Sequence, residues 1–121
     1  MKPLSFVIGL MILVSSCDYN HITAQKTIND YMEQNLLRPS TYNAHFDYSP
    51  SRIKITKKDA ELVNSSLKDR NVEPFDGWCI TVNISADDKN GIKREQCANF
   101  YLNKTCDSVI STDVVSSICK E

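Results

Sequence analysis

Two consecutive runs of alternating residues, 78–86 and 92–102, constrain the fold of this chain most. Apolar side chains fill alternate positions of these runs: Trp78, Ile80, Val82, Ile84 and Ala86 in the first, and Ala98, Phe100 and Leu102 in the second. A period of two is typical of a strand with one buried face, because successive side chains point to opposite sides of a sheet. The two runs therefore predict an antiparallel hairpin.

The loop between the runs determines which residues face each other. A two-residue turn at Asn90 and Gly91 would place Trp78 and Phe100 on opposite faces of the hairpin. A three-residue loop over 89–91, with Gly91 left-handed in a bulge, keeps both aromatic side chains on one face. We therefore expect the second register, which pairs Trp78 with Leu102, Ile80 with Phe100 and Val82 with Ala98.

The remaining segments predict an α+β domain. The expected elements are, in chain order, a helix over 23–37, strands over 42–48 and 52–56, a weaker helix over 59–68, the hairpin, a short strand over 106–111 and a closing helical turn over 114–118. The first helix carries apolar residues at spacings of three and four, so one of its faces can pack on a sheet. We predict that this N-terminal helix covers an antiparallel sheet of about four to five strands.

The N-terminal segment carries a different pattern. A positive charge at Lys2 precedes an apolar run over 4–14, which is too short to cross a bilayer but fits the core of a signal peptide. The segment ends in Val14-Ser15-Ser16-Cys17, which closely resembles the lipobox of bacterial lipoproteins. This resemblance implies that the chain is cleaved before Cys17 and that Cys17 receives a diacylglycerol thioether.

The same resemblance implies how the chain is divided and where it resides. Residues 1–16 are expected to be a signal peptide, 17–22 a lipidated tether, and 23–121 a single small domain on the periplasmic side of the bacterial envelope. Two or more acyl chains hold a protein firmly in a bilayer. Asp18 resembles the signal that retains enterobacterial lipoproteins in the inner membrane. The alternative is an ordinary secretory peptide followed by an unmodified cysteine.

The C-terminal third contains four further cysteines, Cys79, Cys97, Cys106 and Cys119. An even number of cysteines in an exported chain indicates disulfides. Their spacings of 18, 9 and 13 residues lack the close pairs of a structural zinc site, and no histidine lies among them. We therefore predict a disulfide-stapled C-terminal half that holds no metal or other cofactor.

The pairing of these cysteines stays open from the sequence. Closure between neighbours favours Cys79–Cys97 together with Cys106–Cys119. The predicted hairpin register opposes the first pair, because it holds the two cysteines four residues out of step, too far apart for a disulfide.

The sequence contains two histidines, His21 in the expected tether and His45 on the polar side of an expected strand. A catalytic nucleophile needs a base within hydrogen-bond reach, and the sequence offers no such constellation. We therefore predict a protein without enzymatic activity. The alternative is a small envelope enzyme or glycan-binding protein that uses His45 and Asp47.

The candidate binding residues point to a protein partner. The net charge of −1 gives no support for nucleic-acid binding. Tyr42 and Tyr101 are candidates for a partner-binding surface, because tyrosine is a frequent anchor of interfaces. Four basic residues within 52–58 are typical of a solvated strand edge, or of a contact with anionic lipid headgroups if a membrane is near.

Together these features predict a membrane-anchored bacterial lipoprotein that binds a protein partner in the cell envelope. Inhibitors, immunity or exclusion factors and accessory subunits belong to this class. A purely structural envelope lipoprotein is a further alternative.

Overall fold

The computed structural model describes residues 20–66 and 71–120 and shows an α+β domain. The elements in chain order are α2 (His21–Asn35), η1 (Pro39–Thr41), β1 (Asn43–His45), β2 (Ser51–Ile55), α3 (Lys57–Ser66), β3 (Phe75–Asp87), β4 (Lys93–Asn103), β5 (Val109–Thr112) and η2 (Ser116–Ile118). The predictions for the signal peptide, Cys17 and Asp18 lie outside the described residues. The expected tether ends early, because α2 begins at His21, where the Asn20 side chain accepts a hydrogen bond from the backbone N–H of Thr23 (3.0 Å).

The five strands form one antiparallel sheet around β3. β4 pairs with β3 along its whole length, and β5 pairs with the outer side of β4. β1 and β2 share the other edge of β3, with β1 beside its second half and β2 beside its first half. The predicted sheet of about four to five antiparallel strands is thereby confirmed.

The predicted hairpin register is also confirmed. Trp78 faces Leu102, Ile80 faces Phe100 and Val82 faces Ala98. Gly91 adopts a left-handed φ of 77°, and the backbone N–H of Asp88 donates to the carbonyl of Ile92 (3.0 Å). The requirement to bury the aromatic residues on one face therefore selected the correct loop.

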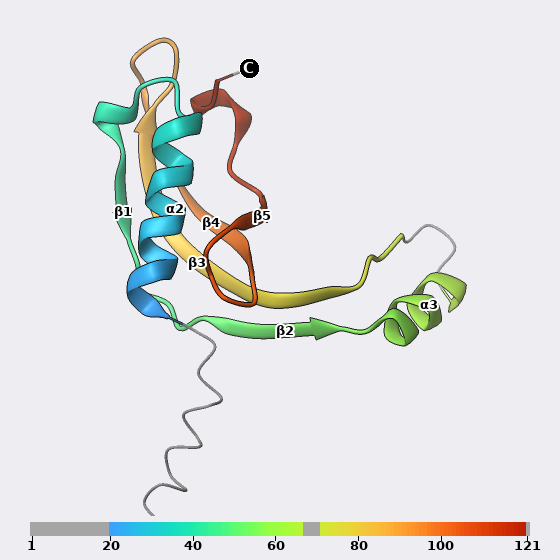
Figure 1. The fold of residues 1–121 in the computed structure, drawn as a ribbon. Helices are drawn as coiled ribbons and strands as arrows, with labels where there is room; N and C mark the ends of the chain where they lie inside the picture. Colours follow the sequence, from blue (N-terminus) through green and yellow to red (C-terminus); the bar gives the residue numbers. More distant parts are fainter. Residues whose placement is uncertain (1–19, 67–70, 121) are drawn as a thin grey trace, which may run out of the picture.

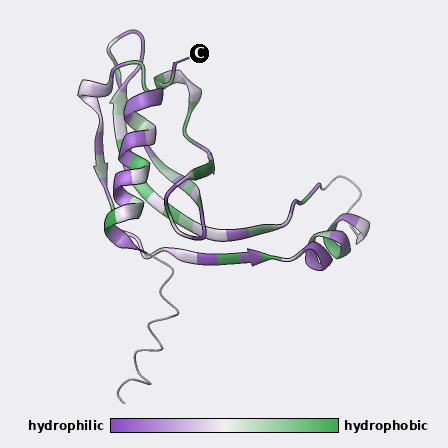
Figure 2. Ribbon diagram, in the orientation of Figure 1, coloured by the Kyte–Doolittle hydropathy of each residue, from purple (hydrophilic) through white to green (hydrophobic). Residues whose placement is uncertain are grey.

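Helix α2 packs across one face of this hairpin (Figure 1). Its buried residues recur every fourth position, which aligns them on one side of the helix: Ala24, Ile28 and Met32, with Leu36 following the last turn. Hydrophobic stretches of β3 and β4 lie behind them (Figure 2). At the centre the ring of Tyr31 contacts the fully buried Phe100 edge to face, with ring centroids 6.4 Å apart. The predicted helix-on-sheet core is present.

The predicted disulfides are wrong for the described residues, because no disulfide joins any two of Cys79, Cys97, Cys106 and Cys119. For Cys79–Cys97 the reason is the register. Cys79 faces Tyr101 and Cys97 faces Asn83, so the two cysteines are four positions out of step. That offset is about 13 Å along the strands, against the roughly 4–7 Å between Cα atoms that a disulfide needs.

For Cys106–Cys119 the reason is the length of α2. The Thr27 hydroxyl donates to the carbonyl of Cys106 (2.7 Å), which places this cysteine beside the first half of the helix. Cys119 pairs with Leu36 beyond the other end of the helix. Nine residues of helix separate these contacts by about 13 Å. The two cysteines therefore lie at opposite ends of the core.

The first half of the β2–β3 pair leaves the body of the domain and carries α3 at its tip (Figure 1). We call β2, α3 and the chain up to Asp76 the arm. Helix α3 begins with reciprocal hydrogen bonds between Thr56 and Asp59, a capping box, so it starts earlier than the sequence pattern indicated. The Asn64 side chain bonds both backbone groups of Val72 (2.7 and 3.0 Å) and closes the tip.

Candidate functional site

An apolar notch lies where the arm leaves the body. Its volume is about 460 Å³, and it is lined by Ile53, Ile55, Glu73, Pro74, Phe75, Tyr101, Ile110 and Ser111. We call these eight residues the apolar notch. They come from four strands and the loop before β3, so only the folded sheet brings them together.

Strand alternation explains why the arm presents an apolar face to the notch. Ile53 and Ile55 alternate with Arg52 and Lys54, so the two kinds of side chain point to opposite faces of β2. Ile55 pairs with Phe75 across the arm. The ring of Phe75 in turn meets Tyr101 edge to face, with centroids 6.1 Å apart at 85°. This aromatic contact connects the arm to the body of the sheet.

The open rim of the notch is apolar as well. Ile110 on β5 (Val109–Thr112) exposes 57% of its surface. Glu73 is the one ionisable carboxylate of the lining. Pockets with a mostly apolar lining and few polar groups are the usual form of a binding site, so the notch is the candidate site of this domain.

Tyr101, a predicted partner-binding residue, therefore lies in the notch. A hydrogen bond joins its hydroxyl to the sulfur of Cys79, which faces it on β3. Burial raises the pKa of the Cys79 thiol, and negative charge on Cys79 would raise the pKa of Tyr101. Both groups are neutral at pH 7, so the notch floor carries no charge from them.

Tyr42, the other predicted partner-binding residue, lies elsewhere. It packs against the core beside α2, and its hydroxyl donates to the side-chain oxygen of Asn29 (2.7 Å). Burial, followed by the negative charge of Glu33, raises the pKa of Tyr42. The structure therefore brings only one of the two tyrosines to the notch.

His45 lines a separate, shallow polar depression of about 370 Å³ on the face of the sheet away from α2. Its strand neighbours form the row His45, Asn83 and Cys97, in which Asn83 separates the imidazole from the thiol by two strand spacings, about 10 Å. Glu95 also lines the depression, whereas Asp47 does not. The His45–Asp47 pair expected for an enzyme is therefore not assembled there.

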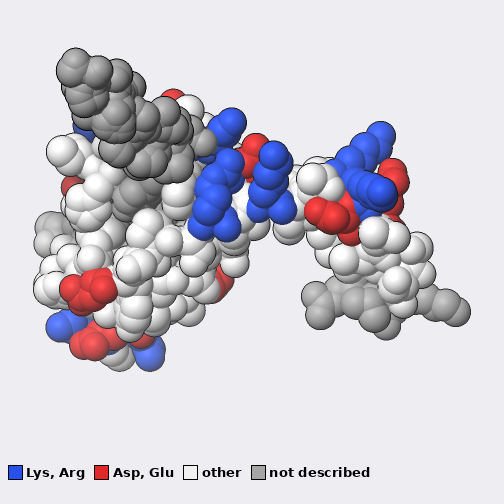
Figure 3. Space-filling model, turned by 90° about the horizontal axis from the view of Figure 1, so that it is seen from below, with Lys and Arg blue, Asp and Glu red and all other residues white. Residues whose placement is uncertain are grey.

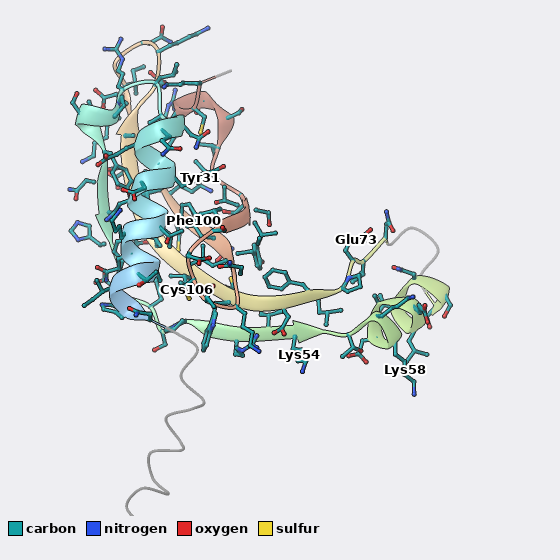
Figure 4. All side chains as sticks on the ribbon, viewed as in Figure 1. Tyr31, Lys54, Lys58, Glu73, Phe100 and Cys106 are labelled. Atoms are coloured by element: carbon teal, nitrogen blue, oxygen red, sulfur yellow. The ribbon has the colours of Figure 1, made fainter. Side chains whose placement is uncertain are left out.

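Basic residues gather on the opposite side of the arm from the notch. Arg52 forms a salt bridge with Asp76 (2.5 Å) and lies over the ring of Trp78. The hydrogen bond from Arg52 lowers the pKa of Asp76, helped by the positive charges of Lys104 and Lys54. Lys58 points the same way as Lys54, and Glu73 points the other way (Figure 4). We call Arg52, Lys54, Lys58 and Lys104 the basic underside.

The described residues contain no metal-binding cluster and no membrane-spanning helix. Residues 20–66 and 71–120 hold no group of three histidine, cysteine, aspartate or glutamate residues placed to bind a metal ion. None of their helices is long and apolar enough to span a bilayer.

No protein-family model matches this chain, and comparisons with curated proteins and with solved structures yield no match.

Tyr101 is the one notch residue that the sequence offered as a candidate, and its role in binding a partner stays a prediction. The alternation of 52–56 predicted that Ile53 and Ile55 share a face, but the partner of that face depends on where β2 pairs along β3. Ile110 sits where the pairing of β4 with β5 shifts register, and such a shift leaves no mark in the pattern.

Proposed function

We propose that this chain is a lipid-anchored, non-enzymatic protein of the bacterial cell envelope that binds a partner protein in its apolar notch. The observation that carries this proposal is the apolar lining of the notch together with the exposed Ile110 on its rim. The class includes inhibitors, immunity or exclusion factors and accessory subunits.

The lining also indicates what the partner presents. An aliphatic or aromatic side chain would bury the rings of Phe75 and Tyr101 further and remove Ile110 from water. Glu73 on the lining favours a basic residue next to that side chain. We therefore propose an apolar segment flanked by lysine or arginine as the bound element.

The anchor is supported by the residues that precede α2. The lipobox ends at Cys17 and the helix begins at His21, so only a few residues separate the acylated cysteine from the folded domain. At no more than about 3.6 Å per residue, that spacer holds the domain within roughly 15 Å of the bilayer surface. A partner in the notch would then be a membrane protein or a protein near the membrane.

Site-specific photocrosslinking in the native host tests the notch. A photoreactive residue at Ile110 is expected to capture a discrete partner, and Ile110→Asp is expected to release it. Ile92→Asp is the matched control, because Ile92 is a similarly exposed isoleucine (51%) in the distant hairpin loop. Equal partner retention by both variants would contradict the proposal. So would crosslinking from a photoreactive residue placed at Ile92 but not from one placed at Ile110.

The alternative of an envelope enzyme or glycan-binding protein rests on the polar depression that contains His45, Glu95 and Cys97. His45→Ala distinguishes it, because the substitution leaves the notch intact. A host phenotype lost with His45→Ala but retained with Ile110→Asp would favour this alternative. A purely structural lipoprotein would tolerate both substitutions.

A further inference from the structure

The root of the arm carries an excess of positive charge on one side. Arg52 forms a salt bridge with Asp76, and the positive charges of Lys104 and Lys54 act on the same carboxylate. Seen from below, lysine and arginine side chains line the narrow part that joins the body to the tip of the arm, and others follow at the tip (Figure 3).

The tip of the arm extends this charge more weakly. Lys57 and Lys58 occupy the first turn of α3, where the helix dipole disfavours a cation, so they contribute little to the stability of the helix. The acidic residues Asp59 and Glu61 lie in the same helix and offset part of the positive charge. The root of the arm therefore carries most of the attraction to an anionic surface.

The basic underside lies at the same end of the molecule as the start of α2. β2 runs level with the first turn of α2 (Figure 1). The bond from Thr27 to the carbonyl of Cys106 places the loop that holds Lys104 beside the same half of the helix. If Cys17 is in the bilayer, the spacer from Cys17 to His21 keeps the start of α2 within roughly 15 Å of it, less than two Debye lengths of about 8 Å at physiological salt.

We propose that the basic underside rests on anionic lipid headgroups, and that this contact presents the apolar notch away from the membrane. The inference rests on the proposed anchor at Cys17. Lys54 and Lys58 point to one side of the arm and Glu73 to the other, so an anionic surface attracts the first side and repels the second (Figure 4). The partner would then approach from the periplasm.

Paramagnetic relaxation from headgroup-labelled lipids tests this orientation. The acylated mature protein is placed in vesicles of phosphatidylcholine with or without phosphatidylglycerol. We expect the anionic vesicles to broaden the amide signals of 52–58 several-fold more than those of Glu73 and Ile110. Phosphatidylcholine alone is expected to remove the difference.

Charge-reversal variants provide the control. The double variant Lys54→Glu and Lys58→Glu is expected to abolish the difference. Each lysine near an anionic surface raises the ratio of docked to undocked protein by about fivefold. Lys89→Glu with Lys93→Glu, at the exposed far end of the hairpin, is expected to preserve it. Equal broadening on both sides of the arm would overturn the proposal. So would binding of an acidic protein to the basic underside with no effect of phosphatidylglycerol on the broadening. Failure of the anchor would appear separately, as loss of cosedimentation with either kind of vesicle.

Discussion

Gly77 is the residue at which the arm separates from the body, and its missing side chain permits the close packing there. A Cβ atom at this position would lie 2.0 Å from the carbonyl oxygen of Leu102 and 2.7 Å from the ring of Phe75. Glycine inside a strand often marks such a close backbone approach. The residue therefore shapes both the hairpin and the adjoining notch.

Gly77→Ala is expected to lower the free energy of unfolding by about 3 kcal/mol or more, because backbone atoms of β4 must move. Gly91→Ala is the control: it strains a left-handed residue in open space and is expected to cost about 1–2 kcal/mol. Urea unfolding of both variants measures the difference. A loss for Gly77→Ala no larger than that for Gly91→Ala would contradict the steric argument.

Asp88 holds the hairpin loop with its carboxylate. One oxygen accepts the backbone N–H groups of Asn90 (2.9 Å) and Ile92 (3.0 Å), and the other accepts from the Arg94 side chain (2.9 Å), while only 4% of the residue is exposed. The hydrogen bond from Ile92, with further help from Arg94, holds the pKa of Asp88 below its ordinary value. The ionised form is therefore stabilised in the folded state.

The sign of the pH dependence follows from that lowered pKa. Asp88 stabilises the fold above its unfolded pKa of about 3.9, and this contribution is lost as the pH falls through the lower folded value. Asp88→Asn is expected to lower the urea midpoint at pH 7, and the gap from the parent protein is expected to close on acidification below pH 3.9. A gap that is independent of pH would contradict this role.

The cysteines differ in accessibility. Cys97 is exposed, whereas Cys79 and Cys119 are half-buried and burial raises the pKa of both thiols. Alkylation of the folded protein at pH 7.5 is expected to modify Cys97 first and Cys79 and Cys119 more slowly, with their rates still rising above pH 9. Peptide mass spectrometry gives the order. Modification of Cys79 before Cys97 would contradict the burial of these thiols. So would equal alkylation rates in the folded and the denatured protein.

Among the elements, α3 depends least on the core. It buries only Ala60 among its residues and lies at the end of the arm, so its capping box supplies much of its local order. Thr56→Ala is expected to weaken α3 by about 1 kcal/mol without moving the global unfolding transition. Hydrogen exchange resolves the two effects. Equal loss of amide protection in α3 and β4 would show that the arm and body unfold together.

The sequence predicted those elements whose own residue pattern determines their structure. The alternation around the loop at Gly91 determined the β3–β4 register, because only one loop length buried Trp78 and Phe100 together. The disulfide prediction was wrong because it rested on the number of cysteines and the expected compartment. The register that opposed the Cys79–Cys97 pair was the better guide.

The arrangement of the whole molecule could not be predicted from the sequence. The notch combines β2, the start of β3, β4 and β5, and no local pattern specifies that Ile53 and Ile110 border the same space. The arm likewise depends on where β2 pairs along β3: β1 pairs with residues 83–85, the pairing breaks over 46–50, and β2 then pairs with residues 75–79. These are long-range pairings, which amphipathic periodicity does not encode.

The proposed orientation gives the arm two roles at this scale. Its basic underside faces the anionic membrane, and its other face borders the notch that receives the partner. The proposals for both faces assume that the folded domain is held close to a bilayer.

Intact-mass analysis and N-terminal peptide mapping of the protein purified from host membranes test that assumption most directly. We expect a mature chain that begins at Cys17 and carries a diacylglycerol thioether. A mature chain that begins at another residue, or that carries no fatty acid on Cys17, would contradict the account.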